Sequence, residues 1–140
     1  MVLSKTSEYA LRAISCFASA SGVPLRTSDI SRQTSVPRAY LSKLLRKLTE
    51  AGILQSQAGH GGGFLLAHDP EQITFLEVLE AVGMRLEADR CYLGLGKCNL
   101  TEPCSLHQSA SMLDQHVLDW ARTTRVSDLA ASQTPCHPEH

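Results

Sequence analysis

Three cysteines and a histidine lie close together in the second half of the chain, in the segment CYLGLGKCNLTEPCSLH. Six residues separate Cys91 from Cys98, and five separate Cys98 from Cys104. His107 follows Cys104 after two more residues. Thiolates and imidazoles bind zinc and iron–sulfur clusters, and thiols also form disulfides. The segment therefore predicts metal or thiol chemistry, and an ordinary loop with accidental cysteines is the less favoured alternative.

The spacing of these residues distinguishes between kinds of metal site. Structural zinc sites usually contain a close C-x2-C pair, which this segment lacks, so zinc is the less favoured metal. Long spacings with glycines let a loop surround an object larger than one ion, such as an iron–sulfur cluster. We expect Cys104 in the first turn of a helix after Pro103, where the helix dipole favours a thiolate, with His107 beside it one turn later.

Length and composition indicate one globular domain. The 140 residues are enough for a hydrophobic core, and 43 % of them are hydrophobic. No apolar run approaches the roughly 18 residues that span a membrane, and Glu8 and Arg12 interrupt the N-terminal apolar stretch. We therefore expect a cytoplasmic protein without a membrane partner. In a reducing compartment five cysteines favour thiol or metal chemistry over a disulfide framework.

The charges are divided between the two halves of the chain. Residues 1–66 carry eight Lys and Arg against three Asp and Glu, a net charge of +5. Residues 67–140 carry five against eleven, a net charge of −6, so the two halves sum to −1. The first half is therefore the part expected to face an anionic polymer such as DNA.

The basic half has the pattern of a helix-turn-helix. We expect a helix over residues 7–20, a short helix in DISRQT capped by Thr27 or Ser28, and a third helix in RAYLSKLLRKLTEAG. Leucines at 41, 44, 45 and 48 mark the core face of the third helix. Its other side chains suit the major groove of DNA. The candidate contacts are Arg38, Ala39, Tyr40, Ser42, Lys43, Arg46 and Lys47.

A glycine-rich hairpin follows the third helix. The pattern predicts two strands, in ILQSQA and FLLA, with the turn between them in GHGGG. Its candidate DNA contacts are His60, Gly61 and Gly62, where the backbone can approach a partner. These patterns predict a mainly α fold with a small β-hairpin wing, in which residues 1–67 form a winged helix-turn-helix domain.

The acidic half is predicted to form a helical arm over residues 68–130, with a short helix at 74–82, the cysteine loop and a long helix. Heptad-like spacing of apolar residues predicts that the long helix pairs with a second copy, and a core helix within one chain is the alternative. The candidate dimerisation residues are Leu106, Leu113, Val117 and Trp120. Residues 131–140 are polar and rich in proline, and we expect them to be disordered.

The chain lacks the sequence patterns of common enzymes. It contains no nucleophile elbow, no paired-carboxylate motif and no dinucleotide-binding fingerprint. We therefore predict that the protein is not an enzyme.

Four stretches together resemble the Rrf family of bacterial transcriptional regulators: LSKTSEYALRA, YLSKLLRKLTEAGIL, GHGGGFLLA and the C-x6-C-x5-C-x2-H run. The resemblance covers residues 1 to about 130. It implies a homodimer that binds operator DNA and carries an iron–sulfur cluster, 2Fe–2S in preference to 4Fe–4S, on Cys91, Cys98 and Cys104. It also implies a fourth ligand, either His107, which we favour because it is local, or Glu8 of the partner subunit.

The resemblance implies a regulator, expected to be a repressor, whose operator affinity is controlled by a cluster that responds to redox state, iron or nitric oxide. A cluster-free thiol–disulfide regulator and a zinc-containing one are the alternatives. The chain departs from the family pattern at Ala58, where several members have arginine, and at Ser42, where an acidic residue contacts bases. We therefore expect this chain to bind an operator sequence that differs from those of other family members.

Overall fold

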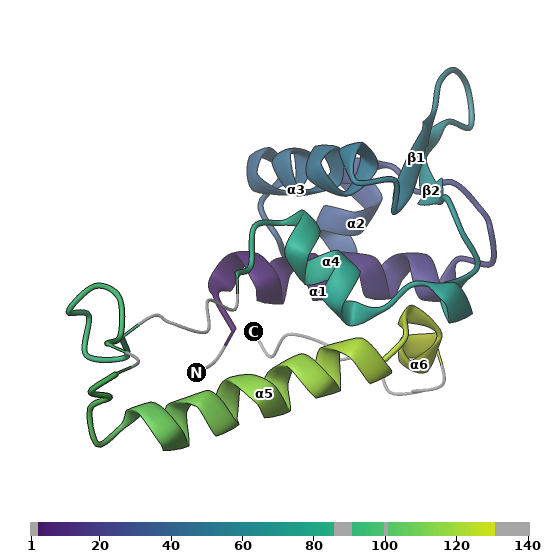
Figure 1. Ribbon diagram of the computed structural model, residues 1–140. Coiled ribbons are helices and arrows are strands. Elements are labelled where there is room, and N and C mark those ends of the chain that lie inside the picture. The colour runs from purple at the N-terminus through teal and green to yellow at the C-terminus, as the bar shows by residue number, and fades with distance from the viewer. Residues whose placement is uncertain (1–2, 86–90, 100, 131–140) are drawn as a thin grey trace.

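The computed structural model describes residues 3–85, 91–99 and 101–130, so the predicted disordered tail lies outside the described residues. In Figure 1 the helices α1 to α4 and the hairpin of β1 and β2 lie on one side of the molecule, and the long helix α5 lies on the other. The elements are α1 Lys5–Ser19, α2 Thr27–Thr34, α3 Arg38–Glu50, β1 Leu54–Gln57, β2 Gly63–Leu66, the 3-10 turn η1 Pro70–Gln72, α4 Phe75–Ala81, α5 His107–Thr123 and α6 Val126–Ala130.

Helix α1 is the centre of the fold, because α2, α3, α4 and α6 all pack against it. The Ser4 side chain accepts a hydrogen bond from the N–H of Ser7 and so caps the helix start. Ala10, Ile14 and Phe17 follow at helical spacing and are buried. Burial of this face against several elements joins both halves of the chain in one core.

Helices α2 and α3 form the helix-turn-helix. Asp29 caps α2 by accepting a hydrogen bond from the N–H of Arg26 at 3.2 Å, rather than the expected Thr27 or Ser28 hydroxyl. Ser35 ends α2 in the left-handed conformation, with φ 59°. The predicted core face of α3 is confirmed, because its four leucines, at 41, 44, 45 and 48, have at most 2 % of their surface exposed.

The wing is a two-stranded antiparallel hairpin, in which Leu54 pairs with Leu66 and Gln57 with Gly63. Phe64 also exchanges two backbone hydrogen bonds of 2.8 Å with Leu25, in the loop before α2. A side chain at Gly63 would collide with the Leu25 carbonyl oxygen, which lies 2.4 Å from the position of a Cβ atom. The glycine therefore lets the wing attach to the helix-turn-helix. The mainly helical fold with a hairpin wing agrees with the sequence-based prediction.

A backbone junction attaches the C-terminal helices to the rest of the fold. The N–H of Phe75 donates to the Thr124 carbonyl at 3.0 Å, and the N–H of Val126 donates to the Ile73 carbonyl at 2.9 Å. Helix α6, which the sequence analysis did not anticipate, packs against α1 and buries Val126 completely. Residues beyond 67 thus share a core with the helix-turn-helix, and the domain boundary drawn there stays a prediction.

Helix α5 is attached to the fold at its C-terminal end. Ala121 is the one buried residue of this helix, and the Trp120 ring packs edge-on against Phe75 at 5.4 Å between centroids. Leu106, Met112 and Leu113 are exposed along the rest of the helix. Among the described residues, no helix is long and apolar enough to span a bilayer.

Leu45 and Lys43 lie on opposite faces of α3 and provide a matched test of the fold. We expect Leu45→Ala to lower the free energy of unfolding by about 2–5 kcal/mol, because it leaves a cavity in a fully buried position. Lys43→Ala, on the exposed face, should change it by less than about 0.5 kcal/mol. Urea denaturation followed by circular dichroism measures both, and equal losses would contradict the burial of the leucine face.

Candidate functional site

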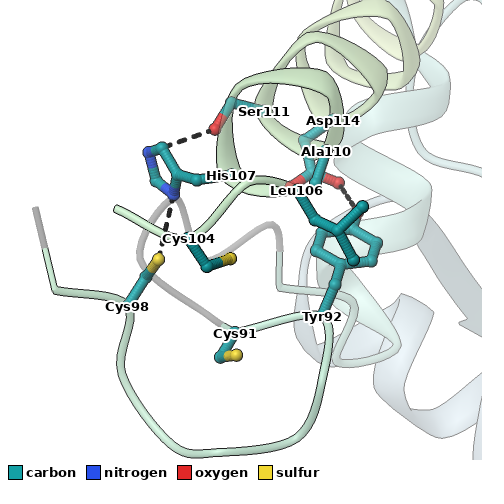
Figure 2. Close-up of a pocket in the computed structure, with 9 residues that line it drawn as sticks. All are labelled: Cys91, Tyr92, Cys98, Cys104, Leu106, His107, Ala110, Ser111 and Asp114. Carbon is teal, nitrogen blue, oxygen red and sulfur yellow. Dashed lines mark hydrogen bonds between the residues drawn. The ribbon is translucent and has the colours of Figure 1, made fainter. Parts of the chain in front are cut away.

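The three cysteines of the loop and the histidine that follows them line one pocket at the start of α5. Figure 2 shows the thiols of Cys91, Cys98 and Cys104 and the imidazole of His107 gathered beside the first turn of the helix. The pocket is completed by Tyr92, Leu106, Ala110, Ser111 and Asp114. The structure thus brings together the thiols and the imidazole that the sequence analysis selected.

The loop that carries Cys91 folds back on itself. The N–H of Cys91 donates to the Gly96 carbonyl at 3.0 Å, and the N–H of Gly94 donates to the Cys91 carbonyl at 3.0 Å. Both glycines have positive φ angles, which lets the chain turn this tightly. Cys91 is consequently buried, with 9 % of its surface exposed, whereas Cys98 is half-buried and Cys104 is exposed.

The His107 imidazole lies against the Cys98 thiol, and Cys104 is not in the first turn of α5 as the sequence predicted. Helix α5 begins at His107, so Cys104 lies in the turn before it, where its carbonyl accepts a hydrogen bond from the His107 N–H at 3.0 Å. The imidazole Nδ1 lies 3.0 Å from the Cys98 Sγ, and Nε2 lies 3.5 Å from the Ser111 hydroxyl. The ring is therefore held between the cysteine loop and the second turn of α5.

Tyr92 and Asp114 are site residues that the sequence analysis missed. The Tyr92 hydroxyl donates a hydrogen bond to the Asp114 carboxylate, which ties the loop to α5 (Figure 2). His107, Ser111 and Asp114 recur at intervals of four and three, so they share one face of the helix. That spacing could have identified Ser111 and Asp114, whereas the contact made by Tyr92 depends on the path of the loop.

The donor set of the pocket fits an iron–sulfur group in chemical type, because three thiols and one imidazole line a single cavity. Within the described ranges, no group of three or more His, Cys, Asp or Glu side chains is arranged to hold a single metal ion. Glu8 does not line this pocket; its carboxylate pairs with Lys5 at 3.6 Å on α1. A ligand role for Glu8 across a dimer stays a prediction.

Cys16 is a different kind of thiol. It lies in α1, packs against the hydrophobic core and contacts the Arg12 carbonyl at 3.9 Å. Burial raises the pKa of the Cys16 thiol by disfavouring the charged thiolate. Because the thiolate is the reactive form, the Cys16 thiol is a weak nucleophile. It also lies outside the pocket.

The candidate DNA-binding surface of α3 is exposed as a whole. The leucine face is buried, so the side chains predicted to contact DNA extend from the opposite faces. Arg46 is paired with Glu50 at 2.9 Å, but both side chains are mostly exposed, so this pair adds little to stability and can be exchanged for a phosphate. The exposed candidates on α3 are Arg38, Ala39, Tyr40, Ser42, Lys43, Arg46 and Lys47.

Tyr40 makes contacts within the fold as well as being exposed. Its hydroxyl is hydrogen-bonded to Thr6, and its ring packs edge-on against Tyr9 at 5.3 Å between centroids. The tyrosine thus fastens the start of α3 to the start of α1. In the wing, His60 and Gly61 are exposed at the tip, whereas Gly62 is buried within the turn. The exposed tip residues remain the wing's candidate contacts.

Comparison with solved structures gives an independent view of the fold. The chain aligns over 94 % of its length, and 97 % of the other chain, with CymR, described as the global cysteine regulator of B. subtilis. The TM-score is 0.77 and the sequence identity 20 %. At this identity the likeness establishes the fold alone.

Curated relatives are closer in sequence. A putative HTH-type transcriptional regulator of Aquifex aeolicus is 30 % identical over 131 residues, covering 92 % of this chain and 91 % of the relative. The HTH-type transcriptional regulator IscR of Cronobacter sakazakii is 32 % identical over 135 residues, covering 95 % and 82 %. The family model Rrf2, described as an iron-dependent transcriptional regulator, matches residues 3–132. The chain therefore belongs to the Rrf2 family of transcriptional regulators, and not to an enzyme family.

Proposed function

We propose that this regulator binds operator DNA as a homodimer and that an iron–sulfur cluster in the pocket at the start of α5 controls its affinity. The observation that carries the proposal is the convergence of Cys91, Cys98, Cys104 and His107 on one pocket of a helix-turn-helix protein. The description of the family as iron-dependent, and the likeness to IscR, support a cluster in this place. We expect a 2Fe–2S cluster, a cytoplasmic location and action as a repressor.

Each ligand would contribute differently to holding the cluster. Cys91 is fixed by the folded loop, and the Tyr92–Asp114 hydrogen bond holds that loop against α5. The His107 ring presents Nδ1 toward Cys98, while Ser111 faces Nε2 and orients the ring. When bound, the cluster supplies a group whose ligation changes on oxidation, nitrosylation or loss of iron. His107 is the one non-cysteine donor among the four and the exchangeable position.

Control of DNA affinity requires that cluster-bound and cluster-free protein differ in the arrangement of the DNA-binding elements. The structure provides a connected route for such a difference. The pocket lies at one end of α5, and the other end is bonded through Thr124 to Phe75 of α4 and continues into α6, which packs on α1. A shift of α5 would therefore reach the helix on which α2 and α3 rest.

Cys98 and Cys16 provide a matched pair for testing the cluster. We expect wild-type protein purified without oxygen to contain iron and acid-labile sulfide and to absorb visible light. Cys98→Ala should remove the absorption and most of the bound iron, because it deletes a pocket thiol. Cys16→Ala should keep both, because that thiol lies in the core outside the pocket. Absorption spectra with iron and sulfide assays measure these outcomes.

The cluster is the regulator only if DNA affinity follows it. Fluorescence anisotropy should give different dissociation constants for a DNA duplex selected by the wild-type protein before and after cluster removal. A colourless wild-type protein, or equal affinity in both states, would contradict the proposal. Bound zinc without visible absorption would instead favour the zinc-containing alternative.

A second candidate is a regulator in which the loop thiols form a reversible disulfide without a cluster. The likeness of fold to the cysteine regulator CymR and the graded exposure of the three thiols favour keeping this candidate. Formation of a disulfide would need an oxidant such as hydrogen peroxide, which accepts two electrons as two thiols lose their protons and join. The cluster and disulfide mechanisms use the same residues and differ in whether iron is present.

Alkylation of cluster-free protein tests how the thiols differ. We expect iodoacetamide at pH 8 to modify Cys104 first, because it is exposed, and Cys16 last. Burial raises the Cys16 pKa above its ordinary value of 9.0, so less thiolate, the reactive form, exists at pH 8. The rate at which iodoacetamide alkylates Cys16 should therefore rise as the pH is raised above 9. Peptide mass spectrometry measures each rate, and modification of Cys16 as fast as Cys104 would contradict its burial.

The apolar face of α5 tests the predicted dimer. Leu113 is 43 % exposed and shares the heptad-like stripe with Leu106, Val117 and Trp120. We expect Leu113→Glu to convert the protein to a monomer, because it places a charge in the predicted interface. Gln108→Glu adds the same charge on the opposite face and should leave the dimer intact. Sedimentation velocity distinguishes the two, and a monomeric wild-type protein would contradict the predicted interface.

A further inference from the structure

A groove between the wing and the start of α2 is lined by cationic and hydroxyl side chains. Arg26 and Arg38 contribute guanidinium groups from the loop before α2 and from the first residue of α3. Thr27 and Ser28 add hydroxyls, and the remaining lining residues come from the wing: Gln57, Gly59, Gly62, Gly63 and Phe64. Of these residues, the sequence analysis selected Arg38 and Gly62 and passed over Arg26.

The two arginines of the groove have no acidic partner in the described part of the chain. The nearest carboxylate along the chain is Asp29, which is already engaged. One of its oxygens pairs with Arg32 at 2.9 Å, and the other accepts the backbone N–H of Arg26 at 3.2 Å. The positive charge of the groove is therefore left for a ligand from outside the chain.

Two glycines of the wing, Gly62 and Gly63, present bare backbone to the groove. A Cβ atom on Gly62 would lie 2.3 Å from the Gln57 carbonyl oxygen, and one on Gly63 would lie 2.4 Å from the Leu25 carbonyl oxygen. Both positions therefore require glycine. At these two positions a ligand can approach the backbone of the wing closely.

We infer that this groove binds the sugar–phosphate backbone of DNA, with Arg26 and Arg38 binding phosphate oxygens. The inference rests on the proposed function and adds Arg26, which lies outside α3, to the candidate contacts. Arginine suits the task because its planar guanidinium donates two parallel hydrogen bonds to a phosphate. Such contacts position the protein on the duplex without reading its sequence. Because Arg38 begins α3 and Arg26 precedes α2, a phosphate bound by both would position α3 relative to the DNA duplex.

Substitution of Arg26 tests the inference through the salt dependence of DNA binding. We expect Arg26→Gln to reduce the slope of log affinity against log salt concentration by about 0.9 for each bound protomer, because one phosphate contact is lost. The affinity of Arg26→Gln relative to that of the wild type should therefore fall about eightfold per protomer when the salt concentration is lowered from 1 M to 0.1 M. The loss should be equal on a duplex selected from a random pool and on a shuffled duplex of the same composition.

Arg122→Gln is the control, because it removes the same charge from an exposed position on α5, outside the groove. It should leave the salt slope unchanged, and both variants should keep the wild-type melting temperature. An unchanged slope for Arg26→Gln, or a loss confined to the selected duplex, would overturn the phosphate contact while leaving DNA binding in place. A wild-type protein that selects no duplex would overturn the proposed function, and the phosphate contact with it.

Discussion

The attachment of α5 at its C-terminal end is the constraint on which the rest of the structure depends. Ala121 is buried against α4, Trp120 packs on Phe75, and the Thr124 carbonyl accepts the Phe75 N–H. The helix then extends away from this attachment (Figure 1). Leu106 and Leu113 are exposed. An apolar face of this length gains free energy when another surface covers it. The geometry that places the cysteine pocket at the far end therefore also favours the proposed dimer.

The division of charge would keep the two proposed functions, DNA binding and chemistry at the cysteine pocket, in separate parts of the molecule. The cations of α3 and of the groove beside α2 belong to the half of the chain with a net charge of +5. The cysteine pocket belongs to the half with a net charge of −6, and Asp114 lines it. DNA would be repelled by the second half and attracted by the first. In the proposed mechanism, a change at the pocket would therefore reach DNA through the fold rather than by direct contact.

Local patterns predicted most of the DNA-binding half. The leucines of α3 recur at helical spacing, so their burial followed from periodicity, and the glycines of the wing marked its turn. Helix α6 was missed because its five residues have little periodicity of their own. It is placed instead by the hydrogen bond from the Val126 N–H to the Ile73 carbonyl and by burial of Val126, which are contacts between segments far apart in the sequence.

The candidate site was predicted in composition but not in geometry. Residue types and spacing brought Cys91, Cys98, Cys104 and His107 into one set, and they line one pocket. The expected place of Cys104 in the first turn of the helix was wrong, because α5 begins only at His107. The contact between His107 Nδ1 and the Cys98 thiol joins the helix to the loop, and the spacing of the residues did not predict it. Helix starts depend on capping and packing, which periodicity does not determine.

The graded burial of the three thiols serves both of the chemistries proposed for the pocket. Cys91 is enclosed by the folded loop, whereas Cys104 is open to solvent. A cluster held here would keep a protected side and present an accessible side to an oxidant or to nitric oxide. Without a cluster, the same gradient makes Cys104 the thiol that meets an oxidant first, after which a less exposed neighbour resolves it. Iron content, rather than the position of the cysteines, is therefore the property that separates the two mechanisms.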